Sequence, residues 1–96
     1  MVLVSRPSHP GEVLDEQFLR PLGLSAGALA RRLGVPRTRI ERLVKAETSM
    51  TADTAIRLAA FFGNDAQFWM GLQTACDLYA ARLRVELRNI TPLDAP

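Results

Sequence analysis

Residues 25–44 read SAGALARRLGVPRTRIERLV, and they are the most informative stretch of this 96-residue chain. Apolar side chains recur in it at helical spacing, at Leu29, Leu33, Ile40 and Leu43. The period is interrupted once, at Gly34-Val35-Pro36, where glycine can adopt a positive φ and proline suits the first turn of a following helix. Ser25 is a suitable N-cap for the first helix. The stretch therefore predicts two short helices joined by a tight turn, which is the helix-turn-helix arrangement.

Four residues of this stretch have the sizes that a sharp helix crossing requires. Ala30 is small where the two helices would approach most closely, and Gly34 lies at the turn. Ile40 faces back into the angle between the helices, and Leu43 continues its apolar stripe. We therefore expect Ala30, Gly34, Ile40 and Leu43 to form the core of the helix-turn-helix.

The free face of the second predicted helix is basic. It carries Arg37, Thr38, Arg39 and Arg42, whose side chains can bind either base edges or phosphates. Six of the 12 basic residues fall between positions 31 and 45, although the net charge of the whole chain is only +2. This concentration favours double-stranded DNA as a partner. The plainer alternative is a helical hairpin whose basic face is merely solvated.

Composition excludes several other classes of protein. The length suits one domain, and no apolar run approaches the roughly 20 residues that span a bilayer. The residues before Pro7 are too few for the apolar core of a signal peptide. The single Cys76 cannot form an internal disulfide, and with the single His9 it cannot build a zinc site, so we expect a cytoplasmic protein without metal or cofactor. No pattern of catalytic residues appears, so neither an enzyme nor a small-molecule substrate is expected.

The rest of the chain predicts an all-α domain of five helices. Residues 1–9 are expected to form an N-terminal arm, in which Val2-Leu3-Val4 could pair as an edge strand or simply fray. The domain spans residues 10–90, and residues 91–96 form a tail. The first helix is expected to run from Pro10 to Leu19 after a cap by His9, with Leu22 and Leu24 filling the core behind it. Thr51 is the expected cap of the fourth helix, and Gly63 its end.

The last predicted helix, residues 66–89, is longer than a domain of this size needs. Its second half carries apolar residues among charged ones, and a single helix of this kind is marginal without packing. We expect it to form a dimer interface through Tyr79, Leu83 and Leu87. The alternative is a helix that frays into solvent past Tyr79.

Several segments between His9 and Leu78 match a known sequence pattern. They are His9–Leu14, Pro21–Ser25, Ala28–Ala30, Leu33–Arg37, Arg39-Ile40, Thr51–Ala55, Arg57–Ala59, Phe61–Gly63, Phe68-Trp69 and Leu72-Gln73. On these segments the chain resembles the HigA antitoxins, a branch of the lambda-repressor-like (Xre-type) helix-turn-helix proteins.

The resemblance implies an all-α homodimer that binds its operator, represses its own operon and neutralises a ribonuclease toxin of the RelE/HigB type. By motif position, it implies that Arg37, Thr38 and Arg42 face base edges in the major groove. Ser25, Arg39 and Lys45 would contact phosphates. It assigns no residues to the toxin-binding surface.

One loop departs from the family pattern. The family usually has an Asn-Gly-Lys-Arg-like turn after the second helix, whereas this chain has Lys45-Ala46-Glu47-Thr48. The helix-turn-helix, its basic face and the family segments support two hypotheses, a DNA-binding antitoxin and a stand-alone repressor without a toxin. The altered loop motivates a third, a protein-binding inhibitor that has lost DNA binding.

Overall fold

A computed structural model describes residues 5–94, which form five helical segments and no strand. The first segment comprises α1 (Pro10–Val13), the π-helix η1 (Leu14–Leu19) and α2 (Arg20–Leu22). The others are α3 (Ala26–Leu33), α4 (Arg37–Val44), α5 (Ala52–Phe62) and α6 (Ala66–Arg82). The expected all-α, five-helix architecture is confirmed.

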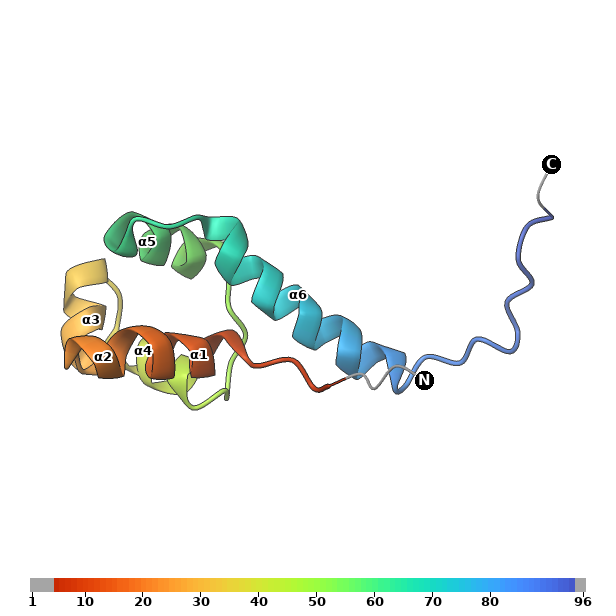
Figure 1. The fold of residues 1–96 in the computed structure, drawn as a ribbon, viewed down its shortest axis with the longest axis horizontal. Coiled ribbons are helices and arrows are strands. Elements are labelled where there is room, and N and C mark those ends of the chain that lie inside the picture. The colour runs from red at the N-terminus through yellow and green to blue at the C-terminus, as the bar shows by residue number, and fades with distance from the viewer. Residues whose placement is uncertain (1–4, 95–96) are drawn as a thin grey trace.

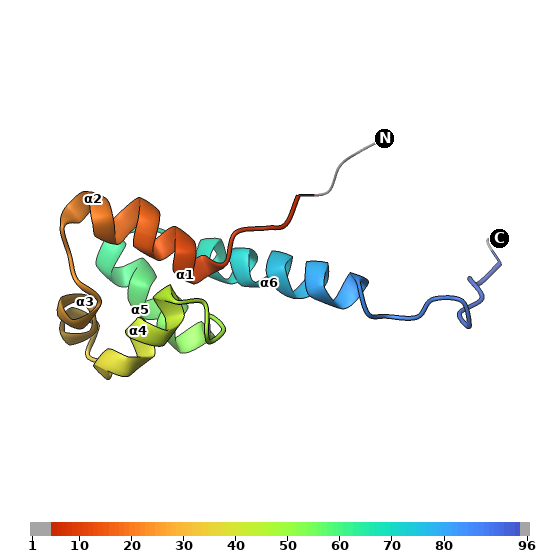
Figure 2. The same ribbon diagram turned by 90° about the horizontal axis from the view of Figure 1, so that it is seen from below.

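The helices form a body at one end of the molecule, from which α6 projects (Figure 1). In this view α5 lies on the opposite side of the body from α1 and α4, and residues 83–94 continue beyond α6 as an extended tail. Figure 2 shows that α3 lies, with α2, at the end of the body farthest from that tail, and that α4 follows next to α3. The helix-turn-helix and the end of α6 are thus well separated.

The core lies where α6 enters the body. Trp69 of α6 is fully buried together with Leu14, Leu29, Ile40 and Leu58, which come from each of the other helical segments. The Trp69 ring packs against Phe18 with 5.0 Å between ring centroids, and its Nε1 donates a hydrogen bond to Asn64 Oδ1 at 3.1 Å. Because the indole N–H has a partner, the side chain can be buried without an unsatisfied donor.

The first helix is longer than expected, because it continues through Pro21 to Leu22 and ends at Gly23, whose φ is +61°. A proline inside a helix has no N–H to donate and clashes with a carbonyl group one turn earlier. Directly before Pro21 the helix takes the wider turns of the π-helix η1, which leave more room for the proline ring. The expectation that Leu22 fills the core is wrong, since 63% of its surface is exposed and Leu19 is buried in its place. A π-helical turn takes in an extra residue, which rotates the following residues around the helix.

The predicted last helix, residues 66–89, is wrong in its extent. The helix ends at Arg82, and Leu83 and Leu87 are 75% and 66% exposed. The residues after it alternate apolar and charged side chains, which is a strand-like period and does not give a helix an apolar face to bury. No helix within residues 5–94 has both the length and the apolar character to cross a membrane. The suggested strand Val2-Leu3-Val4 lies outside the described residues.

Candidate nucleic-acid interface

The helix-turn-helix is built as its sequence indicates. The Ser25 hydroxyl caps α3 by accepting a hydrogen bond from the Ala28 amide at 3.1 Å. Gly34 ends α3 with a φ of +73°, a left-handed conformation that favours glycine. Ala30, Ile40 and Leu43 are all buried between the helices. The sharp turn therefore leaves the outer face of α4 free.

The solvent face of α4 is centred on Thr38, Arg42 and Lys45. These residues are spaced i, i+4 and i+7, so they lie on one side of the helix axis, and all three are exposed. Arg42 and Lys45 form no ion pair within residues 5–94. They form a cationic surface with a hydroxyl beside it, which suits contact with phosphates and base edges.

Arg37 lies at one edge of this face and is paired with a carboxylate. Its stem packs over Gly27 of α3, and its Nε donates to Glu41 Oε2 at 2.8 Å. The hydrogen bond to Glu41 raises the pKa of Arg37, and the charge of Glu41 adds to this effect. The guanidinium remains exposed, so its other N–H groups are free to reach outward.

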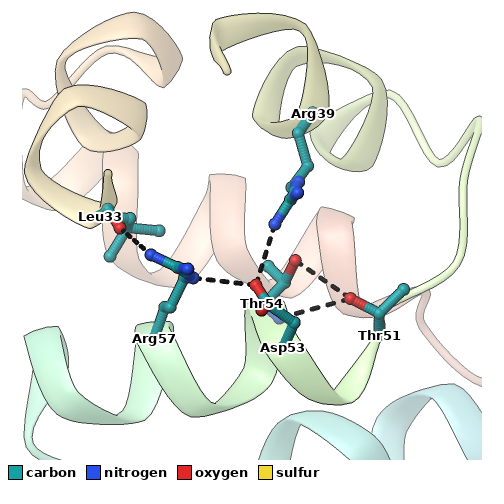
Figure 3. Close-up of polar contacts among 6 residues, drawn as sticks. All are labelled: Leu33, Arg39, Thr51, Asp53, Thr54 and Arg57. Carbon is teal, nitrogen blue, oxygen red and sulfur yellow. Dashed lines mark hydrogen bonds and ion pairs between the residues drawn. The ribbon is translucent and has the colours of Figure 1, made fainter. Parts of the chain in front are cut away.

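Arg39 lies at the other edge and is held by Asp53 of α5 (Figure 3). Arg39 Nη1 donates to Asp53 Oδ1 at 2.9 Å, and Arg57 Nε donates to the same oxygen at 2.8 Å. Arg57 Nη1 also donates to the carbonyl oxygen of Leu33 at 2.8 Å, at the end of α3. The hydrogen bond from Arg57 is the main reason why the pKa of Asp53 is lowered, with Arg39 contributing less. One carboxylate thus connects α4 and α5, and through Arg57 also α3.

A groove of about 540 Å³ runs between α4 and the N-terminus of α5. Arg39, Arg42 and Asp53 line it together with the hydroxyl-bearing side chains of Thr38, Thr48, Ser49, Thr51 and Thr54. Sequence reasoning placed Arg39 on the free face of α4, and it missed that Asp53 holds this side chain. The spacing of Asp53 and Arg57 suggests an ion pair within α5, but no local pattern points from Asp53 to Arg39.

The loop after α4 has an unusual backbone at the position where the family pattern has glycine. Ala46 has a φ of +60°, and it is the one non-glycine residue with a positive φ among those described. The Glu47 amide donates to the carbonyl oxygen of Arg42 at 2.9 Å, which closes the turn. The left-handed turn is therefore kept although the glycine is not.

Sequence reasoning missed two contacts, one that supports α4 and one that anchors the loop between α4 and α5. The backbone of Gly11 in α1 lies against the carbonyl group of Leu43, and the buried Gln73 of α6 accepts a hydrogen bond from the Met50 amide. No group of three or more potential metal ligands occurs within residues 5–94. The described residues therefore present a cationic helix face that is supported from behind by α1 and joined to α5 through Asp53.

Comparisons with known proteins agree with this architecture. The helix-turn-helix family model matches residues 16–69. Antitoxin HigA-1 of Vibrio cholerae is 40% identical over 90 residues, which covers 92% of this chain and 85% of the relative. Virulence-associated protein I of Dichelobacter nodosus is 50% identical over 82 residues, covering 85% and 76% of the two chains.

Solved structures of HigA-type and operator-binding proteins also resemble this chain in fold and sequence. A HigA-family addiction module antidote protein of Coxiella burnetii superposes with a TM-score of 0.86 at 39% identity, covering 93% of this chain and all of its own. A Pseudomonas aeruginosa protein, solved in complex with its 28-base-pair operator DNA, has a TM-score of 0.84 at 42% identity and covers 92% of this chain. The chain therefore belongs to the HigA family of helix-turn-helix proteins.

Proposed function

We propose that this chain is a DNA-binding antitoxin that represses its own operon as a dimer and neutralises a ribonuclease toxin of the RelE/HigB type. The DNA-binding part of this proposal rests on the basic face of α4, which is exposed to solvent after the sharp turn at Gly34. The operator-bound Pseudomonas aeruginosa relative supports this half, because its fold covers nearly the whole chain.

In the proposed complex α4 enters the major groove. Arg37, Thr38 and Arg42 contact base edges, and Ser25, Arg39 and Lys45 contact phosphates on the two sides. Ser25 lies at the N-terminus of α3, where unpaired backbone N–H groups favour an anion. Mutation of Arg42 to Ala should weaken binding to the DNA upstream of the gene by roughly 1–3 kcal/mol. Arg84 in the tail provides a matched control, and equal losses for both variants would contradict the assignment of Arg42.

The dimer half rests on the apolar surface near the end of α6. A groove of about 540 Å³ is lined mainly by Pro7, Ala75, Leu78, Tyr79 and Leu83. The tail adds the exposed Leu87, so Tyr79, Leu83 and Leu87 remain the proposed contacts between two copies. Two copies joined here would present two α4 helices to a two-fold symmetric operator.

Light scattering of the purified chain tests the dimer. Leu83→Asp should shift the mass from dimer to monomer, because a carboxylate would be buried in the interface. Leu22→Asp is the matched control, since Leu22 is also exposed but belongs to α2, which lies at the other end of the molecule from the end of α6 (Figure 1). A monomeric wild-type chain, or a dimer that both variants retain, would rule out this interface.

The toxin half rests on the HigA family membership. It is tested by co-expressing the chain with the product of the adjacent gene and measuring co-purification and ribonuclease activity. A stable complex with suppressed activity supports an antitoxin. If no neighbouring product binds while the upstream DNA does, the chain is a stand-alone repressor instead.

A further inference from the structure

The two arginines that flank the solvent face of α4 are each paired with a carboxylate. Glu41, which holds Arg37, belongs to α4 itself and follows it at i+4. Asp53, which holds Arg39, belongs to α5 and is 14 residues away in the chain. Only the second pair depends on the tertiary fold, and it lies beside the groove between α4 and α5.

Asp53 is held in position by Arg57 and by the capped first turn of α5. Arg57 donates to Asp53 Oδ1 and to the carbonyl oxygen of Leu33, so the second arginine braces the carboxylate against the end of α3 (Figure 3). The Thr51 hydroxyl accepts a hydrogen bond from the Thr54 amide and so holds the first turn of α5, which carries Asp53. The carboxylate is therefore a fixed negative charge at the edge of the candidate interface.

A fixed carboxylate at this position opposes DNA and restrains Arg39 at the same time. Non-specific binding depends on neutralising phosphates, and a cation that already has an internal partner contributes less to it. The Arg39 guanidinium has five N–H donors, and Asp53 engages it through Nη1. The other donors can bind a phosphate without release from Asp53, provided that the phosphate arrives in a defined place.

We propose that Asp53 is a specificity-determining residue, which acts by positioning Arg39. In a loosely seated, non-specific complex, Asp53 keeps Arg39 neutralised and repels the backbone. In the operator complex, base contacts seat α4 so that one phosphate meets Arg39 in the orientation that Asp53 imposes. This inference deepens the proposed DNA-binding function and rests on it.

The test compares the binding of two DNA probes by fluorescence anisotropy over a series of potassium chloride concentrations. One probe is the duplex immediately upstream of the chain's own gene, and the other is a random duplex of the same length and composition. Asp53→Asn should bind the random duplex roughly three- to tenfold more tightly at 0.1 M salt, because about one more counterion is released. The slope of log K against log salt should become steeper by about 1 on this probe. Binding to the upstream duplex should tighten less, so the ratio between the two probes falls.

The matched control is Asp15→Asn. It also removes one negative charge and one exposed ion pair, with Arg20, but on the first helix. It should leave the ratio between the probes unchanged. Asp53→Glu keeps a carboxylate within reach of Arg39 and should restore most of the wild-type ratio.

Whether Asp53 acts through Arg39 is tested by introducing Asp53→Asn into a chain that already carries Arg39→Gln. There, Asp53→Asn should change the ratio and the slope much less than it does with Arg39 present, because only the repulsion between the carboxylate and the DNA backbone is removed, whereas a general effect of charge or stability would be undiminished. An undiminished effect in this background, or an unchanged ratio in Asp53→Asn alone, would overturn the inference. If neither the wild type nor Asp53→Asn binds either probe, the proposed DNA-binding function fails as well.

Discussion

Gly11 in α1 lies directly against the backbone carbonyl of Leu43, close to the end of α4. A Cβ atom added at Gly11 would overlap this carbonyl group, which belongs to the backbone and cannot move aside as a flexible side chain would. The absence of a side chain at Gly11 therefore allows the first helix to support α4 at close range.

We expect Gly11→Ala to destabilise the protein by roughly 1–3 kcal/mol or more, because the two helices would be forced apart. Thermal unfolding followed by circular dichroism measures the effect. Gly71→Ala is the matched control, since Gly71 lies within α6 with no atom near its Cβ position. It should be neutral or stabilising by about 0.5–1 kcal/mol, as alanine favours a helix interior. Equal melting temperatures for both variants would contradict the close contact.

Ala46→Gly should stabilise the protein. Ala46 has a φ of +60°, and a left-handed conformation costs an L-residue roughly 1–2 kcal/mol relative to glycine. Part of this gain is offset by the greater freedom of glycine in the unfolded chain, which leaves a net gain of about 0.5–1 kcal/mol. Lys45→Gly, at the preceding residue with a φ of −87°, should be destabilising instead. Urea unfolding of the two variants tests the prediction, and a loss of stability in Ala46→Gly would show that the turn is not left-handed.

Gln73→Leu should destabilise the protein by roughly 1–3 kcal/mol, because it leaves the buried Met50 amide without an acceptor. Gln73 Oε1 accepts from that amide at 2.7 Å, and Gln73 Nε2 donates to Asp77 at 2.9 Å. Gln67→Leu, on the exposed first turn of α6, is the control and should change stability by less than about 0.5 kcal/mol. Hydrogen exchange of the Met50 amide should accelerate in Gln73→Leu alone, and an unchanged exchange rate would argue against this hydrogen bond.

The pKa of Asp53, measured by NMR titration of its carboxyl carbon, should lie below its ordinary value of 3.8. Arg57→Gln should raise this pKa more than Arg39→Gln does, because the hydrogen bond from Arg57 is the larger cause. Since the folded pKa is the lower one, the pairing stabilises the fold above pH 3.8, and the contribution is lost as the pH falls through the folded value. Arg20→Gln, remote from Asp53, should leave the titration unchanged. An Asp53 pKa at or above 3.8 in the wild type would contradict the pairing.

Much of the fold follows from local chemistry. Thr51 caps α5 and Gly63 ends it, as the sequence predicts, and His9 caps α1 by accepting a hydrogen bond from the Gly11 amide at 2.9 Å. Caps and left-handed glycines act within one turn of chain, so they can be recognised in a short window of residues. The end of α6 could not be found in this way, because Arg82 is not followed by glycine or proline.

The sequence of residues 25–44 by itself determines the helix-turn-helix. Its small, turn-forming and branched side chains follow one another in the order that a sharp helix crossing requires, and this crossing turns the basic face of α4 outward. The pairing of Arg39 with Asp53 and the fit of Gly11 against Leu43 came from the packing of segments that are distant in the sequence. The physical reason is distance along the chain. A hydrogen bond within one helical turn is encoded by neighbouring residues, whereas a contact between helices exists only after the core around Trp69 has brought them together.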